Sequence, residues 1–333
     1  MDNQNKPLLI VILGPTACGK SALAVRIAQT CGGEVVSGDS MQVYRRMDIG
    51  TAKITLQEAA GIPHWLIDIR EPDESFSVAD FRQEAISCID DIIARGRQPI
   101  LCGGTGLYIN SLLQEYHFSA ASGADQRIRE QLRQELRQYG GQALHDRLRQ
   151  IDPAAAERIH VNDAHRLIRA LEVWYTAGVT ISSLREGIGS PPPYRPLLIG
   201  LTRDRENLYR RIETRIDLML ELGLVEEVAA LLESGISRDA VSMQGLGYRQ
   251  IAAYLQGETT LDEAVVLLKR DTRRFAKRQL TWFRRDQRIR WFNLDEYPDE
   301  DRLLQEVLTL IGEADKESVP IERITGTVFE QVE

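Results

Sequence analysis

The stretch Gly14–Ser21 has the sequence GPTACGKS and follows an apolar run, Leu8–Leu13. A segment with helical character, Ala22–Ala28, comes directly after it. A strand, a glycine-bounded loop and a helix in this order are the context of a phosphate-binding P-loop. The backbone N–H groups of such a loop point inward, and the helix N-terminus adds partial positive charge. The sequence therefore predicts an α/β protein with a P-loop NTPase-like parallel sheet flanked by helices.

Two side chains of the loop add chemistry to this backbone cradle. Lys20 brings a full positive charge to bound phosphates, and Ser21 offers its hydroxyl to a Mg²⁺ ion. Cys18 is interpreted as a small filler, because no redox partner is visible. The predicted phosphate-binding residues are Gly14, Pro15, Thr16, Ala17, Cys18, Gly19, Lys20 and Ser21.

The composition is that of an ordinary globular protein. The chain has 333 residues, of which 43% are hydrophobic and 27% charged, enough for one large domain or two modest ones. No apolar run approaches the length of a membrane span, and residues 1–6 carry no secretory signal. The four cysteines are scattered, which predicts reduced thiols rather than disulfides or a zinc site. We therefore expect a cytoplasmic protein with no membrane partner, and a monomer by default.

Charge is distributed unevenly along the chain. The formal net charge is −8, which by itself argues against nucleic acid as a partner. Residues 269–290 nevertheless carry ten Lys and Arg against two Asp, a local charge of +8 that leaves −16 for the rest. Phe275, Trp282 and Phe283 lie among these cations, as in surfaces that contact phosphates and stack on bases. A helix with these aromatics mostly in the core and several cations on phosphate satisfies both interpretations.

A polar cluster with the sequence GDSMQVY occupies residues 38–44, after an expected strand at Glu34–Ser37. Open α/β sheets bind ligands beyond the carboxyl ends of their strands, so Asp39 should lie near the P-loop. Its position alone fits a helix N-cap and a catalytic carboxylate equally well. The density of polar groups around it favours the catalytic role.

Another expected strand, Gln98–Cys102, ends in the sequence GGTGLY at residues 103–108. A kinase or ATPase often has a metal-binding Asp at such a strand end, whereas Gly-Gly-Thr stands here. The glycines allow a ligand to approach the backbone closely, and Thr105 can donate a hydrogen bond to it. A tight turn with a solvent-facing threonine is the alternative.

Other parts of the chain carry structural signals. We expect a strand at Trp65–Ile69, and we interpret His64 before it as a hydrogen-bonded loop histidine. Ser77 and Asp80 form a capping-box pair at the start of a helix. Ile289–Phe292 is the last expected strand.

The domain organisation follows from a change of periodicity. Helical periodicity dominates from about residue 111, and an apolar strand returns at Leu197–Leu201. We therefore expect a discontinuous core domain at 1–115 and 197–313, a mostly helical insertion at 116–196, and a polar tail at 314–333. By default, we interpret most arginines of the insertion as lying on solvent-exposed helix faces.

Together these motifs resemble the tRNA dimethylallyltransferase family (tRNA isopentenylpyrophosphate transferases), bacterial type, over nearly the whole chain. The resemblance adds the sequences DIGTAK at 48–53, ND at 162–163, RLIRALE at 166–172, RID at 215–217 and AKRQLTWFR at 276–284. Cys18 and Trp65 depart from the residues commoner at their positions, and the zinc finger of eukaryotic members is absent.

The resemblance implies a reaction. A dimethylallyl group would move from dimethylallyl diphosphate to N6 of adenosine 37 of tRNA, giving N6-(dimethylallyl)adenosine and releasing diphosphate. The P-loop would then hold the diphosphate of the donor, with Mg²⁺ at Ser21. Asp39 would act as general base, Thr105 would hydrogen-bond where donor and adenine meet, and Arg215 would stabilise the leaving diphosphate.

The resemblance also implies which residues contact tRNA, whose adenosine must leave its stack to react. Those implied around the base and in the insertion are Asp39, Ser40, Met41, Gln42, Thr105, Arg127, Asp163, Ala164, His165, Arg166 and Leu167. Further candidates are Gln244, Gly247, Arg249, Lys277, Arg278 and Arg284.

Three rival functions share parts of this pattern. An adenylate isopentenyltransferase uses the same donor but needs neither a long insertion nor a basic segment. A small-molecule P-loop kinase is disfavoured by the Gly-Gly-Thr strand end. A non-catalytic RNA-binding protein with a degenerate P-loop is disfavoured by the intact Lys20, Ser21 and Asp39.

Overall fold

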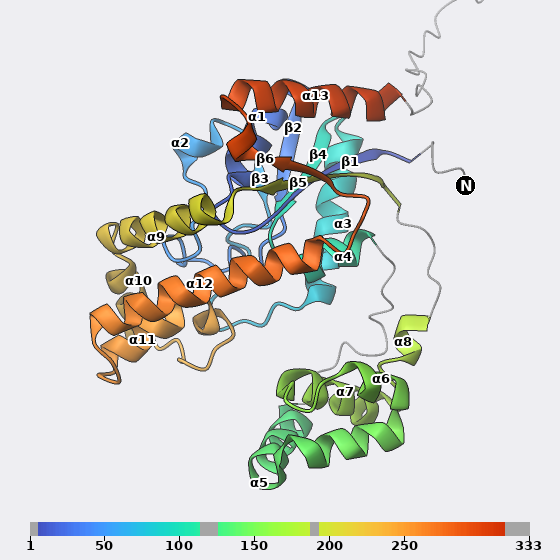
Figure 1. Ribbon diagram of the computed structural model, residues 1–333, viewed down its shortest axis with the longest axis vertical. Helices are drawn as coiled ribbons and strands as arrows, with labels where there is room; N and C mark the ends of the chain where they lie inside the picture. Colours follow the sequence, from blue (N-terminus) through green and yellow to red (C-terminus); the bar gives the residue numbers. More distant parts are fainter. Residues whose placement is uncertain (1–5, 114–125, 187–192, 317–333) are drawn as a thin grey trace, which may run out of the picture. The chain divides into compact units, whose positions relative to one another are not determined.

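The apolar run before the P-loop lies at the centre of a parallel sheet. The computed structural model describes residues 6–113, 126–186 and 193–316. In this part of the chain, six strands form one sheet in the order β3-β2-β4-β1-β5-β6, and every neighbouring pair is parallel (Figure 1). The strands are β1 (Leu8–Leu13), β2 (Gly33–Ser37), β3 (His64–Trp65), β4 (Gln98–Gly103), β5 (Arg195–Thr202) and β6 (Arg290–Asn293).

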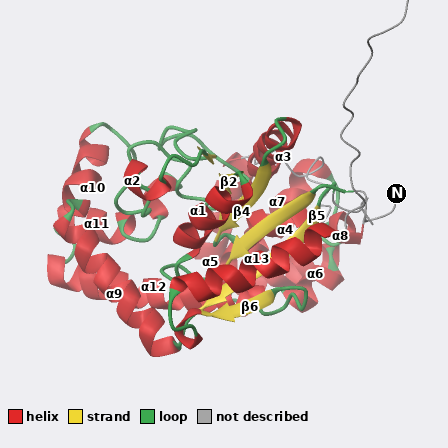
Figure 2. Ribbon diagram, turned by 90° about the horizontal axis from the view of Figure 1, so that it is seen from above, coloured by secondary structure: helices red, strands yellow, loops and turns green. Residues whose placement is uncertain are grey.

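Helices cover both faces of this sheet. All six residues of β1 are buried, which is expected of a strand that is covered on both faces. Helices α1 and α13 pack on each other and on the sheet, and α3 packs against β2 and β4 (Figure 2). The predicted α/β fold is confirmed. The α-helices in residues 6–113 and 193–316 are α1 (Lys20–Cys31), α2 (Leu56–Ala59), α3 (Val78–Ala94), α4 (Gly106–Leu113), α9 (Arg205–Glu221), α10 (Leu224–Glu233), α11 (Tyr248–Leu255), α12 (Leu261–Phe283) and α13 (Glu300–Lys316).

Local signals explain where several elements begin and end. The capping box predicted for α3 is confirmed, because Ser77 and Asp80 exchange side-chain and backbone hydrogen bonds. The strand expected at Trp65–Ile69 is wrong in extent, since β3 ends at Trp65. Leu66 and Asp68 both adopt positive φ, of 63° and 58°, and this conformation ends an extended strand.

A second compact unit comprises residues 110–192 by its internal contacts, and the first comprises 1–109 and 193–333. The second unit contains α5 (Gln126–Ile151), α6 (Pro153–Arg158), α7 (Ala164–Ala177) and α8 (Ser183–Glu186). Its core contains Leu132, Leu144, Leu148, Leu167 and Leu171. Oε2 of the fully buried Glu172 accepts hydrogen bonds from Arg129 at 3.0 Å and Arg169 at 2.9 Å. These two arginines pair its charge, whereas Oε1 has no partner among the described residues.

The observed boundaries differ from the expected ones at two places. Arg195 and Pro196, assigned to the insertion, instead pair with Leu8 and Leu9 of β1. Helix α13 continues to Lys316, so residues 314–316 are helical and do not belong to a tail. The remainder of the expected tail, 317–333, lies outside the described residues, as do positions 116–125 and 187–192 of the expected insertion. Within the described residues, no helix is both long and apolar enough to cross a membrane.

Candidate active site

The P-loop connects β1 to α1 and depends on glycine at two positions. Gly14 has φ +148° and Gly19 has φ +110°, a region of backbone conformation that L-residues with a side chain rarely adopt. A Cβ atom at Gly14 would also overlap the carbonyl oxygen of Leu201 in β5. The loop can therefore turn tightly against the neighbouring strand and direct its backbone toward the end of the sheet.

Side chains from distant segments hold this loop. Lys20 Nζ donates a hydrogen bond to the carbonyl oxygen of Pro15 at 2.7 Å. Arg211 Nε in α9 donates to the carbonyl of Ala17 at 3.0 Å, and Arg203 Nε donates to that of Cys18 at 3.3 Å. Arg211 adds positive charge beside the loop, whereas the charge of Arg203 is paired with Asp295 at 2.7 Å. The sequence analysis identified neither arginine as a contact of this loop.

Asp39 and Thr105 lie at the carboxyl ends of β2 and β4. Asp39 Oδ1 accepts the backbone N–H of Met41 at 2.8 Å, and Thr105 Oγ1 accepts that of Ser40 at 3.1 Å. The N-cap interpretation of Asp39 is wrong, because the next helix, α2, begins only at Leu56. Oδ2 of Asp39 has no hydrogen-bond partner among the described residues, so this oxygen is available to accept a proton.

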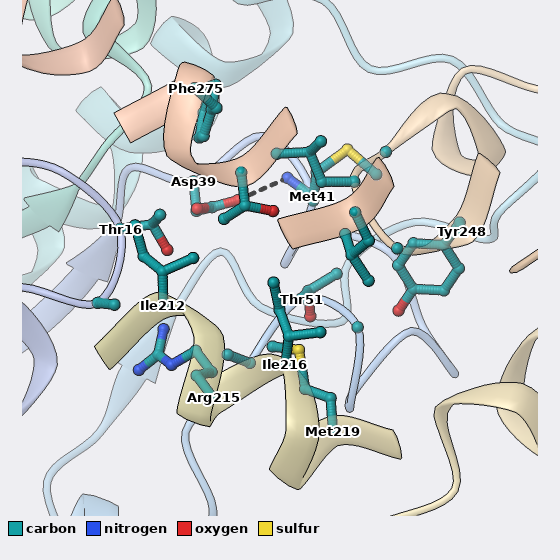
Figure 3. A pocket seen from close by; sticks show the side chains of 18 of the residues that line it. Thr16, Asp39, Met41, Thr51, Ile212, Arg215, Ile216, Met219, Tyr248 and Phe275 are labelled. Atoms are coloured by element: carbon teal, nitrogen blue, oxygen red, sulfur yellow. Dashed lines mark hydrogen bonds between the residues drawn. The ribbon is translucent and has the colours of Figure 1, made fainter. Parts of the chain in front are cut away.

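A cavity of about 320 Å³ opens between the P-loop, α9, α11 and α12 (Figure 3). Thr16, Asp39 and Arg215 lie toward one side of it, and Met219 and Tyr248 toward the other (Figure 3). Its volume falls in the range of small-molecule sites. The predicted site residues that line it are Thr16, Ala17, Asp39, Ser40, Met41, Thr105, Arg215, Gln244, Gly247, Arg249 and Arg278.

A second cavity of about 540 Å³ shares Ala52, Arg215 and Met219 with the first. Ser21 lies on the wall of this second cavity and is exposed to solvent. Arg215 therefore lines both cavities, whereas Ser21 lines the second one but not the first. Gln42 lies elsewhere, around a small space that it shares with Ser37 and His64.

The charge on Arg215 lies in a concavity. Its guanidinium is reached by solvent, yet many protein atoms surround it. This loss of hydration, followed by repulsion from Arg211, lowers the pKa of Arg215. A cation that has lost part of its water and faces another cation is stabilised by a bound anion. The pair is thus suited to a diphosphate.

A carboxylate missed by the sequence analysis shapes the wall of the cavity. Glu227 in α10 accepts the backbone N–H groups of Asp48, Ile49 and Gly50 at 2.7–3.0 Å, and the hydroxyl of Tyr248 at 2.6 Å. Burial and then Glu227 raise the pKa of Tyr248. Glu227 therefore fixes the loop at residues 48–50, whose Gly50 lines the cavity. No local sequence pattern predicts this role.

The cysteines differ in their surroundings. All four are free thiols in the structure. Burial raises the pKa of Cys102 to about 12 and that of Cys88 to about 11. Both thiols therefore stay protonated near neutral pH.

The exposed basic residues of α12 lie on the side opposite its buried face. Lys277, Arg278 and Arg284 are exposed, whereas Ala276 and Phe283 are buried. Phe275 and Trp282 are half-buried, so the aromatics are only partly in the core. Lys277 and Arg284 do not line the cavity.

The predicted RNA-contacting residues of the second unit differ in their exposure to solvent. Arg127, His165 and Arg166 are exposed, and Asp163 caps α7 by accepting the N–H of Arg166 at 3.2 Å. Leu167 is fully buried in the core of that unit. An RNA contact at Leu167 stays a prediction that only its backbone could satisfy, because its side chain is inaccessible.

Comparison with protein families assigns the chain. The model of the IPP transferase family matches residues 42–286. The chain belongs to the IPP transferase family. The family predicted from the motifs is therefore confirmed, and the protein is an enzyme, a prenyltransferase.

Known IPP transferases resemble the chain over almost its whole length. The tRNA dimethylallyltransferase of Acetivibrio thermocellus is 50% identical over 306 residues, which cover 92% of this chain and 96% of that protein. The full-length tRNA isopentenylpyrophosphate transferase of Bacillus halodurans shares 47% identity with a TM-score of 0.71, covering 94% of this chain and 98% of that one. A eukaryotic dimethylallyltransferase acting on tRNA has a TM-score of 0.79 at 28% identity, covering 96% of this chain and 81% of that one.

Proposed function

We propose that this prenyltransferase moves a dimethylallyl group from dimethylallyl diphosphate to N6 of adenosine 37 in tRNA. The observation that carries the proposal is the composition of the 320 Å³ cavity, which joins the P-loop, Asp39 and Arg215 to an apolar wall with Met219. An anionic leaving group and an apolar five-carbon chain need this combination. The names of the relatives support the same donor and acceptor.

The donor's diphosphate would be bound by the P-loop residues 14–21. Lys20 would leave the carbonyl of Pro15 and turn its ammonium group to the phosphates, while Arg211 and Arg215 supply charge from α9. Interactions that strengthen as the leaving group gains negative charge accelerate the reaction. The crowded cation at Arg215 is such a group, because the charge it faces grows in the transition state.

Mg²⁺ belongs to this proposal, and the residues present fit it. No group of three or more His, Cys, Asp or Glu side chains in the described ranges could hold a metal by itself. The ion would be held by Ser21 Oγ together with the diphosphate and water, as suits a cation that keeps several waters and binds substrate phosphates. When bound, Mg²⁺ neutralises charge on the leaving diphosphate.

Asp39 would take the proton from the acceptor. The N6 lone pair is delocalised into the purine, so the amine is a weak nucleophile. As the N6–C1 bond forms and the C1–O bond breaks, the electron pair of the C1–O bond leaves with diphosphate and the N6 proton passes to Asp39 Oδ2. The hydrogen bond from Met41 to Oδ1 holds the carboxylate in place, and Thr105 lies beside it.

The acceptor is proposed to be tRNA rather than a mononucleotide. Adenosine 37 would flip out of the anticodon loop into the cavity, while Lys277, Arg278 and Arg284 on α12 bind phosphates. The exposed residues Arg127 and Arg166 would contact the same RNA. A free nucleotide would not require Lys277 and Arg284, which lie outside the cavity. We include in the proposal a cytoplasmic place of action, where tRNA is available, and a monomeric enzyme.

The test is a transfer assay with two acceptors. The purified protein is mixed with Mg²⁺, dimethylallyl diphosphate and either an unmodified tRNA with adenosine 37 or AMP. Digestion and mass spectrometry then detect a five-carbon gain on adenosine. Gain on the tRNA alone is the expected result. Gain on AMP alone would instead assign a nucleotide acceptor, and ATP turnover without any gain would assign a kinase.

A further inference from the structure

A buried glutamine of α12 joins the two halves of the candidate active site. Gln279 is 7% exposed. Its Oε1 accepts the backbone N–H of Thr16 in the P-loop at 2.9 Å, and its Nε2 donates to the carbonyl oxygen of Gly104 at 2.9 Å. One carboxamide thus pairs with a backbone donor of the P-loop, which follows β1, and with a backbone acceptor that follows β4. These two hydrogen bonds connect the ends of β1 and β4 to α12.

The packing of this region is built around the bridge. A Cβ atom at Gly104 would overlap Nε2 of Gln279, and one at Gly106 would overlap the indole of Trp282. The glycines therefore allow α12 to lie directly on the turn at residues 103–106. A longer side chain at Gly104 would displace the carboxamide, while leaving the glutamine free to rotate elsewhere.

The bridge continues to the proposed base. Thr105 follows Gly104, and its Oγ1 accepts the N–H of Ser40, the residue after Asp39. The carbonyl of Gly38 also accepts the N–H of Thr105 at 3.3 Å. Displacement of Gly104 would therefore move Asp39 relative to Thr16. The donor would be held on the Thr16 side of this chain of contacts, and the acceptor on the Asp39 side.

We propose that Gln279 is a positioning residue that sets the separation between the diphosphate cradle and the Asp39 base. The inference rests on the proposed function, because it assumes that these two groups act on one reaction. Chemical steps between two bound reactants depend steeply on their alignment, and a displacement of about 1 Å can cost about 10²-fold in rate. Loss of the bridge should therefore lower kcat rather than the affinity for either substrate.

The test compares Gln279→Met with a matched control, Gln98→Met. Gln98 also bridges with its carboxamide, donating to the carbonyls of Leu8 and Pro99 at 3.0 Å, but at the amino ends of β1 and β4. We expect Gln279→Met to lower kcat for transfer to a tRNA anticodon stem-loop by about 10²-fold, with KM for both substrates changed by less than about threefold. Gln98→Met should lower thermal stability but leave kcat unchanged.

A second variant covers the case in which Gln279→Met does not fold. Gly104→Ala keeps the glutamine and displaces its carboxamide from the β4 side, so it should lower kcat in the same way. In the double variant the two losses should not add, because both remove one bridge. Wild-type kcat in either single variant, an equal loss in Gln98→Met, or additive losses would overturn the proposal.

Failure of the proposed function has a different signature. If the wild-type protein transfers nothing to the stem-loop, the reaction assignment fails, and the bridge is then tested by amide hydrogen exchange of the peptide that contains Thr16. This peptide should exchange faster in Gln279→Met than in Gln98→Met, because the backbone N–H of Thr16 loses its hydrogen-bond acceptor. Equal exchange rates in the two variants would overturn the positioning role.

Discussion

The lining of the cavity and the exposed face of α12 use polar side chains in opposite ways. Asp39 and Thr105 each accept a backbone N–H group and are fixed at the carboxyl ends of β2 and β4. Lys277 and Arg284 extend from α12 into solvent. Fixed groups in a concavity can stabilise a transition state, whereas exposed cations mainly attract a polyanion. The difference predicts that rate effects belong to the first region and salt-dependent binding effects to the second.

The largest expected effect tests the fixed region. Asp39→Asn should lower the single-turnover rate of transfer by about 10²–10⁴-fold, because the amide cannot take the N6 proton. Binding of the tRNA should change little. The exposed Asp262 in the first turn of α12 gives a control, since Asp262→Asn should leave the rate unchanged. A rate for Asp39→Asn close to that of the wild type would remove the base assignment.

The next effect concerns the cation in the concavity. Arg215→Met should lower the rate by about 10²–10³-fold, because the leaving diphosphate loses a charge aimed at it. Arg210→Met, on the exposed surface of the same helix, is the matched control. Single-turnover kinetics at saturating donor would measure both. Equal losses in the two variants would show that α9 tolerates neither change, and would contradict a specific role for Arg215.

Substitutions in the exposed region should change the salt dependence of tRNA binding rather than the rate of transfer. Lys277→Ala should weaken tRNA binding and reduce the slope of log K against log salt by about 0.7–0.9, the value for one lost phosphate contact. Lys316→Ala at the end of α13 is the control. Fluorescence titrations at several salt concentrations would measure the slopes. An unchanged slope for Lys277→Ala would place Lys277 outside the RNA contact.

The smallest expected effect concerns the pH dependence of the free energy of unfolding, through His64 in β3. Burial lowers the pKa of His64, although its Nδ1–H donates to the carbonyl of Ile62 at 2.8 Å. The unfolded chain, with a histidine pKa near about 6.5, then binds a proton that the folded chain does not. The free energy of unfolding should therefore fall as the pH is lowered through this value toward the folded pKa. Denaturant unfolding of His64→Asn should show a flatter pH dependence between pH 5 and 7, and an identical profile would contradict the assignment.

The sequence predicted the parts of this account that depend on local chemistry. Each of these signals lies within a few consecutive residues: the P-loop, the polar residues after β2 and β4, and the capping box of α3. Gln279, Arg211 and Glu227 could not be found in this way, because each is a polar residue of an amphipathic helix whose partner is a backbone group far away in the chain. The early end of β3 was missed since positive φ at Leu66 and Asp68 involves residues that rarely adopt it.

The most direct test separates chemistry from binding in one titration. Single-turnover transfer is measured against anticodon stem-loop concentration for the wild type, Asp39→Asn and Lys277→Ala, each at low and moderate salt. The account predicts that Lys277→Ala reaches the wild-type rate once the RNA saturates, while Asp39→Asn stays slow at every concentration. A Lys277→Ala rate that remains low at saturation, or an Asp39→Asn rate that recovers, would contradict it.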